Sequence, residues 1–125
     1  MDHQKIAIIG LGRIGSAFLG NLLARSGRGV NVVGVAEASD TPGRQLAIDA
    51  GLTIATLDEI VALGSGVDIL FDLTGLPEVR REIREKLMAQ DNHHTVVASE
   101  TIARLICSLT ATDDLPEIAG RSIGY

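Results

Sequence analysis

The sequence predicts a single domain with a doubly wound α/β fold, built on a parallel sheet of five strands in the order 3-2-1-4-5. Two observations lead to this prediction. Strand-like apolar runs alternate along the chain with stretches of helical periodicity, as in folds where each helix returns the chain to a parallel strand. The strand runs are apolar at consecutive positions, which is typical of parallel strands covered on both faces. The right-handed crossover rule then gives the strand order.

Five apolar runs provide the strands, and the fourth is the most continuous because it is stopped only by Gly75. The predicted strands cover residues 6–9, 30–36, 52–55, 67–74 and 95–98. In a sheet with this order, a ligand binds in the crevice between the carboxyl ends of the first and fourth strands.

Caps and helix breakers place helices between these strands. Thr41 and Pro42 are typical of a cap and a first helical residue, and Thr56 with Glu59 predicts a capping box. Gly27 is expected to end the first helix. The later helices are predicted at residues 42–50, 57–63, 77–90 and 101–109. The domain is thus expected to span residues 1–109, and residues 110–125 to form a tail that is mobile or ordered by a partner.

The most informative motif lies between the first strand and the first helix, where Gly10-Leu11-Gly12-Arg13-Ile14-Gly15 forms a G-x-G-x-x-G run. In this setting the first glycine permits a tight turn, the second lets the backbone approach a pyrophosphate, and the third lets the helix pack closely on the sheet. The N–H groups of the helix start, at Arg13 and Ile14, favour a phosphate. The motif therefore predicts a bound dinucleotide, and a purely structural turn is the alternative.

The acidic residue at the end of the next strand supports a dinucleotide. Glu37 lies roughly 20 residues after the glycine run, the spacing expected for the carboxylate that binds the adenosine ribose. Such a carboxylate accepts hydrogen bonds from the ribose hydroxyls and repels a 2′-phosphate. The sequence therefore predicts NAD as the cofactor in preference to NADP. The alternative is that Glu37 is a solvated residue at a strand end.

Residues that follow the fourth and fifth strands would border the nicotinamide. Thr74 and Gly75 are assigned to coenzyme binding, with a turn that merely ends the strand as the alternative. Ser99 and Glu100 follow the fifth strand. Glu100 is interpreted as an exposed residue at the start of the last helix, where carboxylates are favourable, rather than as an acid or base. No catalytic residue is assigned.

Charge and composition argue against several functions. A formal net charge of -5 disfavours nucleic acids and anionic membranes as partners, and no apolar run is long enough to span a membrane. The single cysteine, Cys107, predicts a reducing compartment, and a cytoplasmic location is expected. His93 and His94 are adjacent, so on a strand they would point to opposite faces and could not share a metal. No metal site is predicted.

The last predicted helix carries an apolar stripe formed by Ile102, Leu105, Ile106 and Leu109. This stripe is wider than the covering of one sheet edge requires. Because large exposed apolar patches mark interfaces and most oligomers are two-fold dimers, the sequence predicts a homodimer formed through this helix.

The glycine run, the strand that ends at Glu37, and the segment Phe71–Gly75 followed by Pro77-Glu78-Val79 resemble the amino-terminal NAD-binding domains of homoserine and aspartate dehydrogenases and of the glucose-fructose oxidoreductase family. The resemblance covers about residues 5–100 and implies a Rossmann-like fold and bound NAD. In the last of these families a Glu-Lys-Pro motif with a catalytic Lys follows the fifth strand. This chain has Glu100-Thr101-Ile102 there, without the Lys.

A closer resemblance is to the Rossmann-like domains at the amino end of some bacterial sensor histidine kinases. It is carried by the Thr-Gly-x-x-Glu-Val element at residues 74–79 and by Ala103-Arg104-Leu105. It implies a module that binds a nucleotide without turning it over and signals to a separate partner chain. The leading hypothesis is therefore a stand-alone NAD(H)-binding module with a sensing or regulatory role. The alternative is an NAD-dependent oxidoreductase, or the coenzyme-binding part of one, whose substrate domain is missing or lies on another chain.

Overall fold

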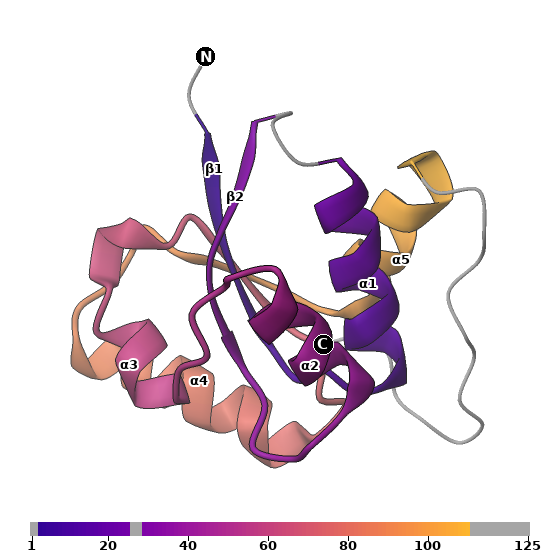
Figure 1. Cartoon of the computed structure of the whole chain (residues 1–125). Coiled ribbons are helices and arrows are strands. Elements are labelled where there is room, and N and C mark those ends of the chain that lie inside the picture. The colour runs from indigo at the N-terminus through magenta and orange to yellow at the C-terminus, as the bar shows by residue number, and fades with distance from the viewer. Residues whose placement is uncertain (1–2, 26–28, 111–125) are drawn as a thin grey trace.

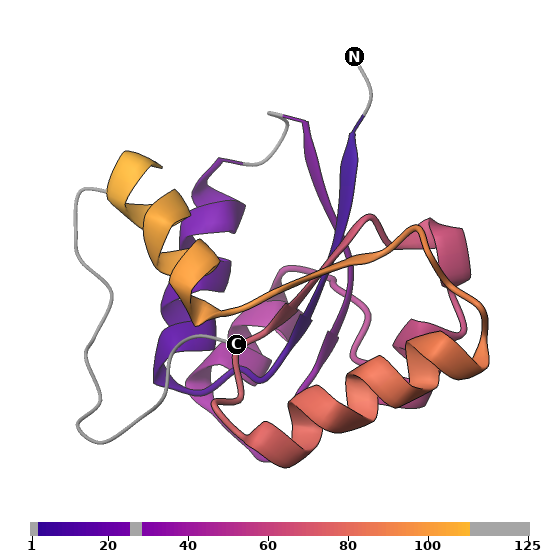
Figure 2. The ribbon, with the colours of Figure 1, turned by 180° about the vertical axis from the view of Figure 1, so that it is seen from behind.

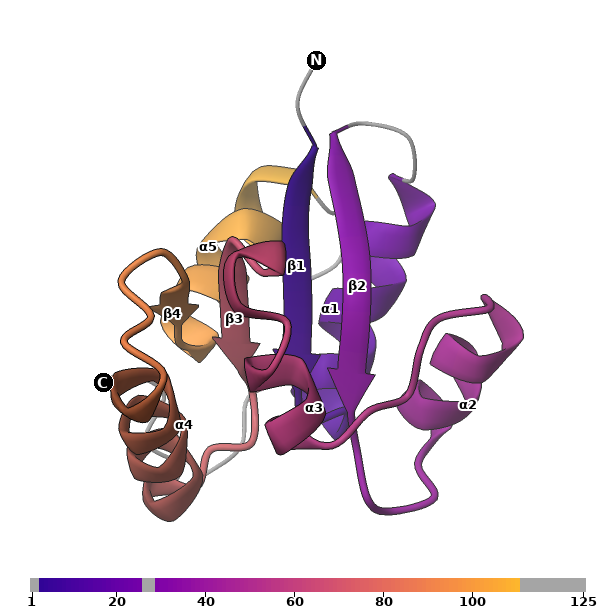
Figure 3. The ribbon, with the colours of Figure 1, turned by 90° about the vertical axis from the view of Figure 1, so that its left-hand side faces the viewer.

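The computed structural model describes residues 3–25 and 29–110, and these residues form a parallel sheet with helices on both faces (Figure 1). The sheet has four strands in the order β2-β1-β3-β4, which Figure 3 shows across its width. The strands are β1 (Gln4–Ile9), β2 (Val30–Ala36), β3 (Ile69–Asp72) and β4 (Val96–Ala98). All the strand pairs are parallel.

Two apolar clusters hold the helices against the sheet, because successive residues of β1 point to opposite faces. Ile6 and Ile8 pack with α1 (Arg13–Ala24) and α5 (Glu100–Thr110). Ala7 and Ile9 pack with α3 (Leu57–Val61) and α4 (Pro77–Ala89) on the other face. Figure 2 shows α1 beside α5, with α4 across the sheet from them. The remaining α-helix, α2 (Pro42–Asp49), contacts α1.

The prediction of five strands is wrong, because the predicted edge strand at residues 52–55 is not a strand of the sheet. Residues 52–55 make only a single parallel bridge, between Ile54 and Val35. The N–H of Val35 donates to the Thr53 carbonyl at 3.0 Å, and the N–H of Ala55 donates to the Val35 carbonyl at 2.8 Å. The segment has little room to extend further, because α2 ends before Gly51, where φ is +76°, and Thr56 already caps α3. The inner strand order is nevertheless the predicted one, with β3 and β4 in the places of the predicted fourth and fifth strands.

The predicted caps are confirmed. The Thr41 hydroxyl accepts a hydrogen bond from the Arg44 N–H at 3.1 Å, with Pro42 as the first residue of α2. Thr56 and Glu59 form both hydrogen bonds of the capping box, at 3.0 and 3.1 Å. Two other predictions, the helix end at Gly27 and the tail after residue 110, fall outside the described residues.

The last helix is present, and three of the four residues of its predicted apolar stripe face outward, whereas Ile106 is partly buried against the core. Its buried residues are Glu100, Ala103 and Cys107, whereas Ile102, Leu105 and Leu109 are 43%, 54% and 76% exposed. No helix in the described part of the chain is both long and apolar enough to cross a membrane.

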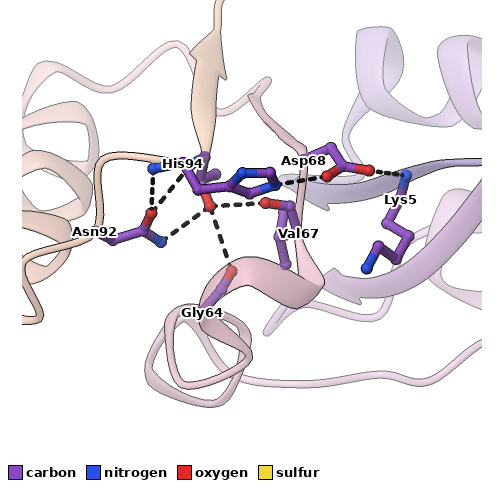
Figure 4. A network of polar contacts seen from close by, with 7 residues as sticks. Lys5, Gly64, Val67, Asp68, Asn92 and His94 are labelled. Atoms are coloured by element: carbon purple, nitrogen blue, oxygen red, sulfur yellow. Dashed lines mark hydrogen bonds and ion pairs between the residues drawn. The ribbon is translucent and has the colours of Figure 1, made fainter.

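A polar network fastens the amino ends of three strands (Figure 4). Asp68, just before β3, accepts hydrogen bonds from the Lys5 N–H at 2.8 Å and pairs with His94 Nε2 at 2.6 Å. The hydroxyl of Thr95 donates to the Val67 carbonyl at 2.7 Å. The hydrogen bonds from Lys5 and His94 hold the pKa of Asp68 below its usual value. The network lies at the end of the sheet opposite to the predicted ligand crevice and joins β4 to β3 and β1.

Candidate functional site

A cleft of about 670 Å³ opens at the carboxyl ends of β1, β2 and β3. This is the edge of a doubly wound sheet where ligands bind, and the volume falls within the usual range for small-molecule sites. Its walls come from the turn between β1 and α1, the segment after β2, residues 54–57 and the segment that joins β3 to α4. Among the residues predicted for the site, Gly10, Gly12, Glu37 and Thr74 line this cleft.

Two of the three glycines in the turn are required by the fold. Gly10 adopts a φ of +95°, and a Cβ there would lie 3.0 Å from the Thr74 backbone nitrogen. A Cβ on Gly15 would lie 2.0 Å from the Gly10 carbonyl oxygen, much closer than two such atoms can approach. The tight turn and the close packing of α1 are therefore as predicted.

Gly12 is different, because no described atom beyond its own neighbours in the chain lies within 4 Å of the position that its Cβ would take. Its backbone is extended, with φ -76° and ψ -150°, so its φ is outside the positive range that favours glycine. It is the N-cap of α1 and supplies no side-chain cap. The fold leaves open space directly over the start of α1, where the first N–H groups of a helix lack partners within the helix.

The next two residues of the turn contribute in different ways. Arg13 is exposed, whereas the side chain of Ile14 is fully buried in the core with Phe18 and Leu19. Ile14 can therefore face a ligand through its backbone N–H alone.

The half-buried Glu37 is hydrogen bonded to the glycine turn. One carboxylate oxygen accepts a hydrogen bond from the Leu11 N–H at 2.8 Å, and the other accepts from the Ser39 N–H at 3.0 Å. Each carboxylate oxygen can accept more than one hydrogen bond. The carboxylate is thus held beside the turn with capacity for further donors.

The start of α2 packs against this turn through residues that the sequence analysis missed. A Cβ on Gly43 would lie 2.0 Å from the Ser16 hydroxyl and 2.9 Å from the Leu11 carbonyl oxygen. Arg44 then donates from Nε to the Glu37 carbonyl at 3.0 Å and lines the cleft. A glycine directly after the helix-starting Pro42 was the available signal, since Pro-Gly pairs mark special backbone positions.

On the other side of the cleft, Thr74 is fixed by Asp72, a buried carboxylate that the sequence analysis also missed. Asp72 Oδ1 accepts hydrogen bonds from the Thr74 N–H at 3.1 Å and from its hydroxyl at 2.7 Å. The Thr74 hydroxyl in turn accepts from the Leu76 N–H at 3.1 Å. Gly75 has a φ of +69° and is not among the cleft residues. Thr74 therefore forms the strand-ending turn and lines the cleft at the same time.

The residues after β4 do not reach this cleft. Ser99 and Glu100 are absent from its lining, and Glu100 is the first residue of α5, as interpreted from the sequence. The expectation that its carboxylate is exposed is wrong, because Glu100 is only 2% exposed. The helix start lies against the sheet, so this side chain points into the domain. The cleft thus joins the glycine turn to the segments after β2 and β3 and leaves Ser99 and Glu100 outside.

No protein-family model and no curated protein matches this sequence, but its structure is similar to solved structures. Homoserine dehydrogenase from S. aureus superposes with a TM-score of 0.58 at 14% identity, over 88% of this chain and 30% of that one. GenD2 from gentamicin A biosynthesis, in complex with NAD, gives a TM-score of 0.58 at 21% identity, over 89% and 32%. An NAD-binding protein from Listeria innocua gives a TM-score of 0.55 at 23% identity, over 88% and 32%.

This chain has a Rossmann-like fold. It spans about a third of the length of the structures that it matches. The resemblance to homoserine dehydrogenases is thereby confirmed at the level of the fold. None of these three structures is a sensor histidine kinase, so that resemblance stays a prediction.

Proposed function

We propose that this chain binds NAD(H) in the cleft at the carboxyl ends of β1, β2 and β3. The observation that carries the proposal is the open space over Gly12 at the start of α1, beside a glutamate that is hydrogen bonded to the same turn. A glycine that the fold itself does not require is explained if a ligand needs the space.

The chemistry of the residues present fits a dinucleotide. The N–H groups at the start of α1 suit a pyrophosphate, and the Glu37 carboxylate suits the ribose hydroxyls. The apolar side chains of Leu57, Leu76 and Val79 line the cleft and suit a planar base. When bound, NAD supplies a nicotinamide ring that can accept a hydride, and NADH one that can give it.

The charges around the cleft favour NAD over NADP. Glu37, Glu59 and Glu82 line it, and Arg44 is the basic residue among the lining residues. The 2′-phosphate of NADP would add negative charge beside Glu37, and repulsion between like charges in a partly enclosed site costs binding free energy. The Arg44 guanidinium, which donates to the Glu37 carbonyl, offsets only part of the negative charge of the three glutamates.

Calorimetric titration of the purified chain with NAD and with NADP tests the proposal. We expect saturable NAD binding with a Kd of roughly 1 μM to 1 mM and NADP binding about tenfold weaker or worse. Glu37→Gln removes the negative charge and should reduce the difference between the Kd values of the two coenzymes. Equal or tighter binding of NADP by the unchanged chain would overturn the assignment of Glu37, and no binding of either would overturn the proposal.

Two biological roles are compatible with such a site. The first is a sensing or regulatory module that binds NAD(H) without turning it over. The second is the coenzyme-binding part of an oxidoreductase, and it is supported at least as well, because homoserine dehydrogenase chains of about three times this length contain the same fold. A cytoplasmic location and a separate partner chain remain part of the first proposal.

A further inference from the structure

Part of the cleft is formed by two helices that an ion pair joins. Leu57 and Glu59 come from α3, and Val79 and Glu82 come from α4. Lys86 of α4 contacts the Asp58 carboxylate of α3 and lies 3.6 Å from Glu82 Oε1. The position of Glu82 is therefore linked to both helices that wall this end of the cleft.

The three acidic residues that line the cleft differ in the number of hydrogen bonds that their carboxylates already accept. Both oxygens of Glu37 accept backbone hydrogen bonds, and one oxygen of Glu59 accepts from the Thr56 N–H in the capping box. Glu82 interacts with Lys86 at a distance longer than a hydrogen bond, and its side chain is 54% exposed. Glu82 thus retains the most capacity to accept hydrogen bonds from a ligand.

Lys86 engages Glu82 less closely than it engages Asp58. Its ammonium group is engaged mainly by Asp58, whose hydrogen bond is the largest cause of the raised pKa of Lys86. Because Asp58 is on the neighbouring helix, the cation is drawn toward α3 and Glu82 remains its more distant partner.

The surroundings of Glu82 match one kind of chemical group. Leu57, Leu76 and Val79 offer apolar contacts to a flat ring. An ionised carboxylate can only accept hydrogen bonds, so it attracts a ring that carries an amino group and repels one that presents a carbonyl oxygen at the same place. We infer that Glu82 accepts a hydrogen bond from the exocyclic amino group of a 6-aminopurine, an inference that rests on the proposed binding of NAD(H) and concerns its adenine ring.

The consequence is selectivity between adenine and hypoxanthine. In hypoxanthine a carbonyl replaces the 6-amino group, so the same contact would bring two acceptors together. The ring would have to shift from its place against the apolar side chains to offer its N1–H to Glu82 instead. A hydrogen bond to a charged acceptor contributes about 1.5–3 kcal/mol. Because Glu82 is half-exposed to solvent, we expect its contribution at the lower end of this range. The structure therefore predicts that NAD binds about tenfold more tightly than its hypoxanthine analogue.

Titration with NAD and with nicotinamide hypoxanthine dinucleotide tests this inference, for the unchanged chain and for Glu82→Gln. The glutamine side chain can accept from an amino group or donate to a carbonyl, so Glu82→Gln should bind both dinucleotides with affinities within about twofold of each other. Glu85→Gln is the matched control, since Glu85 is an exposed residue of the same helix outside the cleft lining. It should keep the full preference for NAD.

Each outcome has a separate meaning. Equal affinity of the unchanged chain for the two dinucleotides, or a preference that persists in Glu82→Gln, would overturn the inference and leave the proposed function intact. Failure of the folded chain to bind either dinucleotide would overturn the proposed function itself. Circular dichroism of the variants shows whether each is folded before it is titrated.

Discussion

The α-carbon of Gly15 lies so close to the Gly10 carbonyl that a Cβ at position 15 would be 2.0 Å from the carbonyl oxygen. The turn and the first helix are therefore joined by backbone contact. Three residues earlier, a Cβ on Gly12 would meet nothing within 4 Å among the described atoms beyond its own neighbours in the chain. One motif thus contains a glycine that the fold needs and a glycine that the fold alone does not explain.

Substitution of these two glycines should separate folding from binding. Gly15→Ala forces the turn and α1 apart, and we expect it to lower the free energy of unfolding by about 3 kcal/mol or more. Gly12→Val should lower it by roughly 1 kcal/mol, the scale of an altered N-cap, while weakening NAD binding at least tenfold. Urea denaturation and NAD titration measure the two effects. A Gly12→Val protein that binds NAD normally would contradict a pyrophosphate at this position.

The polar network at the opposite end of the sheet should make stability depend on acid pH. The Lys5 N–H and His94 hold the pKa of Asp68 below its usual value. When folding lowers the pKa of a carboxyl group, the group stabilises the folded protein at pH values above the pKa that it has in the unfolded chain. This stabilisation is lost as the pH falls through the pKa that the group has in the folded protein. Asp68→Asn should therefore reduce stability at pH 6, by an amount that shrinks as the pH falls below about 4.

Urea denaturation from pH 3 to pH 7 checks this prediction. Asp91→Asn is the matched control, because Asp91 pairs with His93 at 2.8 Å but both side chains are almost fully exposed, at 92% and 86%. Exposed pairs contribute little, so this variant should remain close to the unchanged chain at every pH. A loss in Asp68→Asn that is the same at pH 3 and pH 6 would count against the assigned role of its charge.

The outward face of α5 makes the predicted homodimer testable. Ile102, Leu105 and Leu109 are exposed, and burial of such side chains between two copies is favourable. We expect sedimentation velocity to show a dimer whose population rises with concentration and falls in Leu105→Glu. The control is Leu63→Glu, at an exposed leucine just after α3 on the other face of the sheet. It should leave the population of the dimer unchanged. A chain that stays monomeric at high concentration would refute the prediction.

We also expect the isolated chain to show no appreciable hydride transfer. The reaction needs a substrate held against the nicotinamide and an acid or base within hydrogen-bond reach. The resemblance to the family with the Glu-Lys-Pro motif implies Thr101 in the place of its catalytic Lys, and Glu100 is buried. Absorbance assays with NAD(H) and small aldehydes, 2-oxo acids and polyols should stay at background. Turnover that disappears in Glu100→Gln would show a catalytic role for that residue.

Local sequence signals predicted most of the fold. The caps at Thr41 and Thr56 and the tight turn at Gly10 depend on neighbours within a few residues, so their residue types are sufficient to recognise them. The edge strand at 52–55 was overpredicted because its apolar residues suit a strand, while its length is limited by the helices on either side. Strand propensity contains no information about that limit.

The parts of the site that the sequence did not reveal depend on contacts between distant segments. Arg44 and Gly43 matter because α2 packs on the glycine turn, and Glu82 lines the cleft because α4 lies beside α3. The burial of Glu100 likewise follows from how α5 meets the sheet. No spacing along the chain encodes these approaches.

Amide chemical shifts during an NAD titration test the central claim most directly. With the ¹⁵N-labelled chain, the account predicts saturable shifts at Gly12, Arg13 and Ile14, where the N–H groups of α1 begin, and at Leu11 and Ser39, whose N–H groups bind Glu37. Residues of the Asp68 network at the far end of the sheet should shift little. Shifts that do not saturate, or that centre on the Asp68 network instead of the glycine turn, would contradict the account.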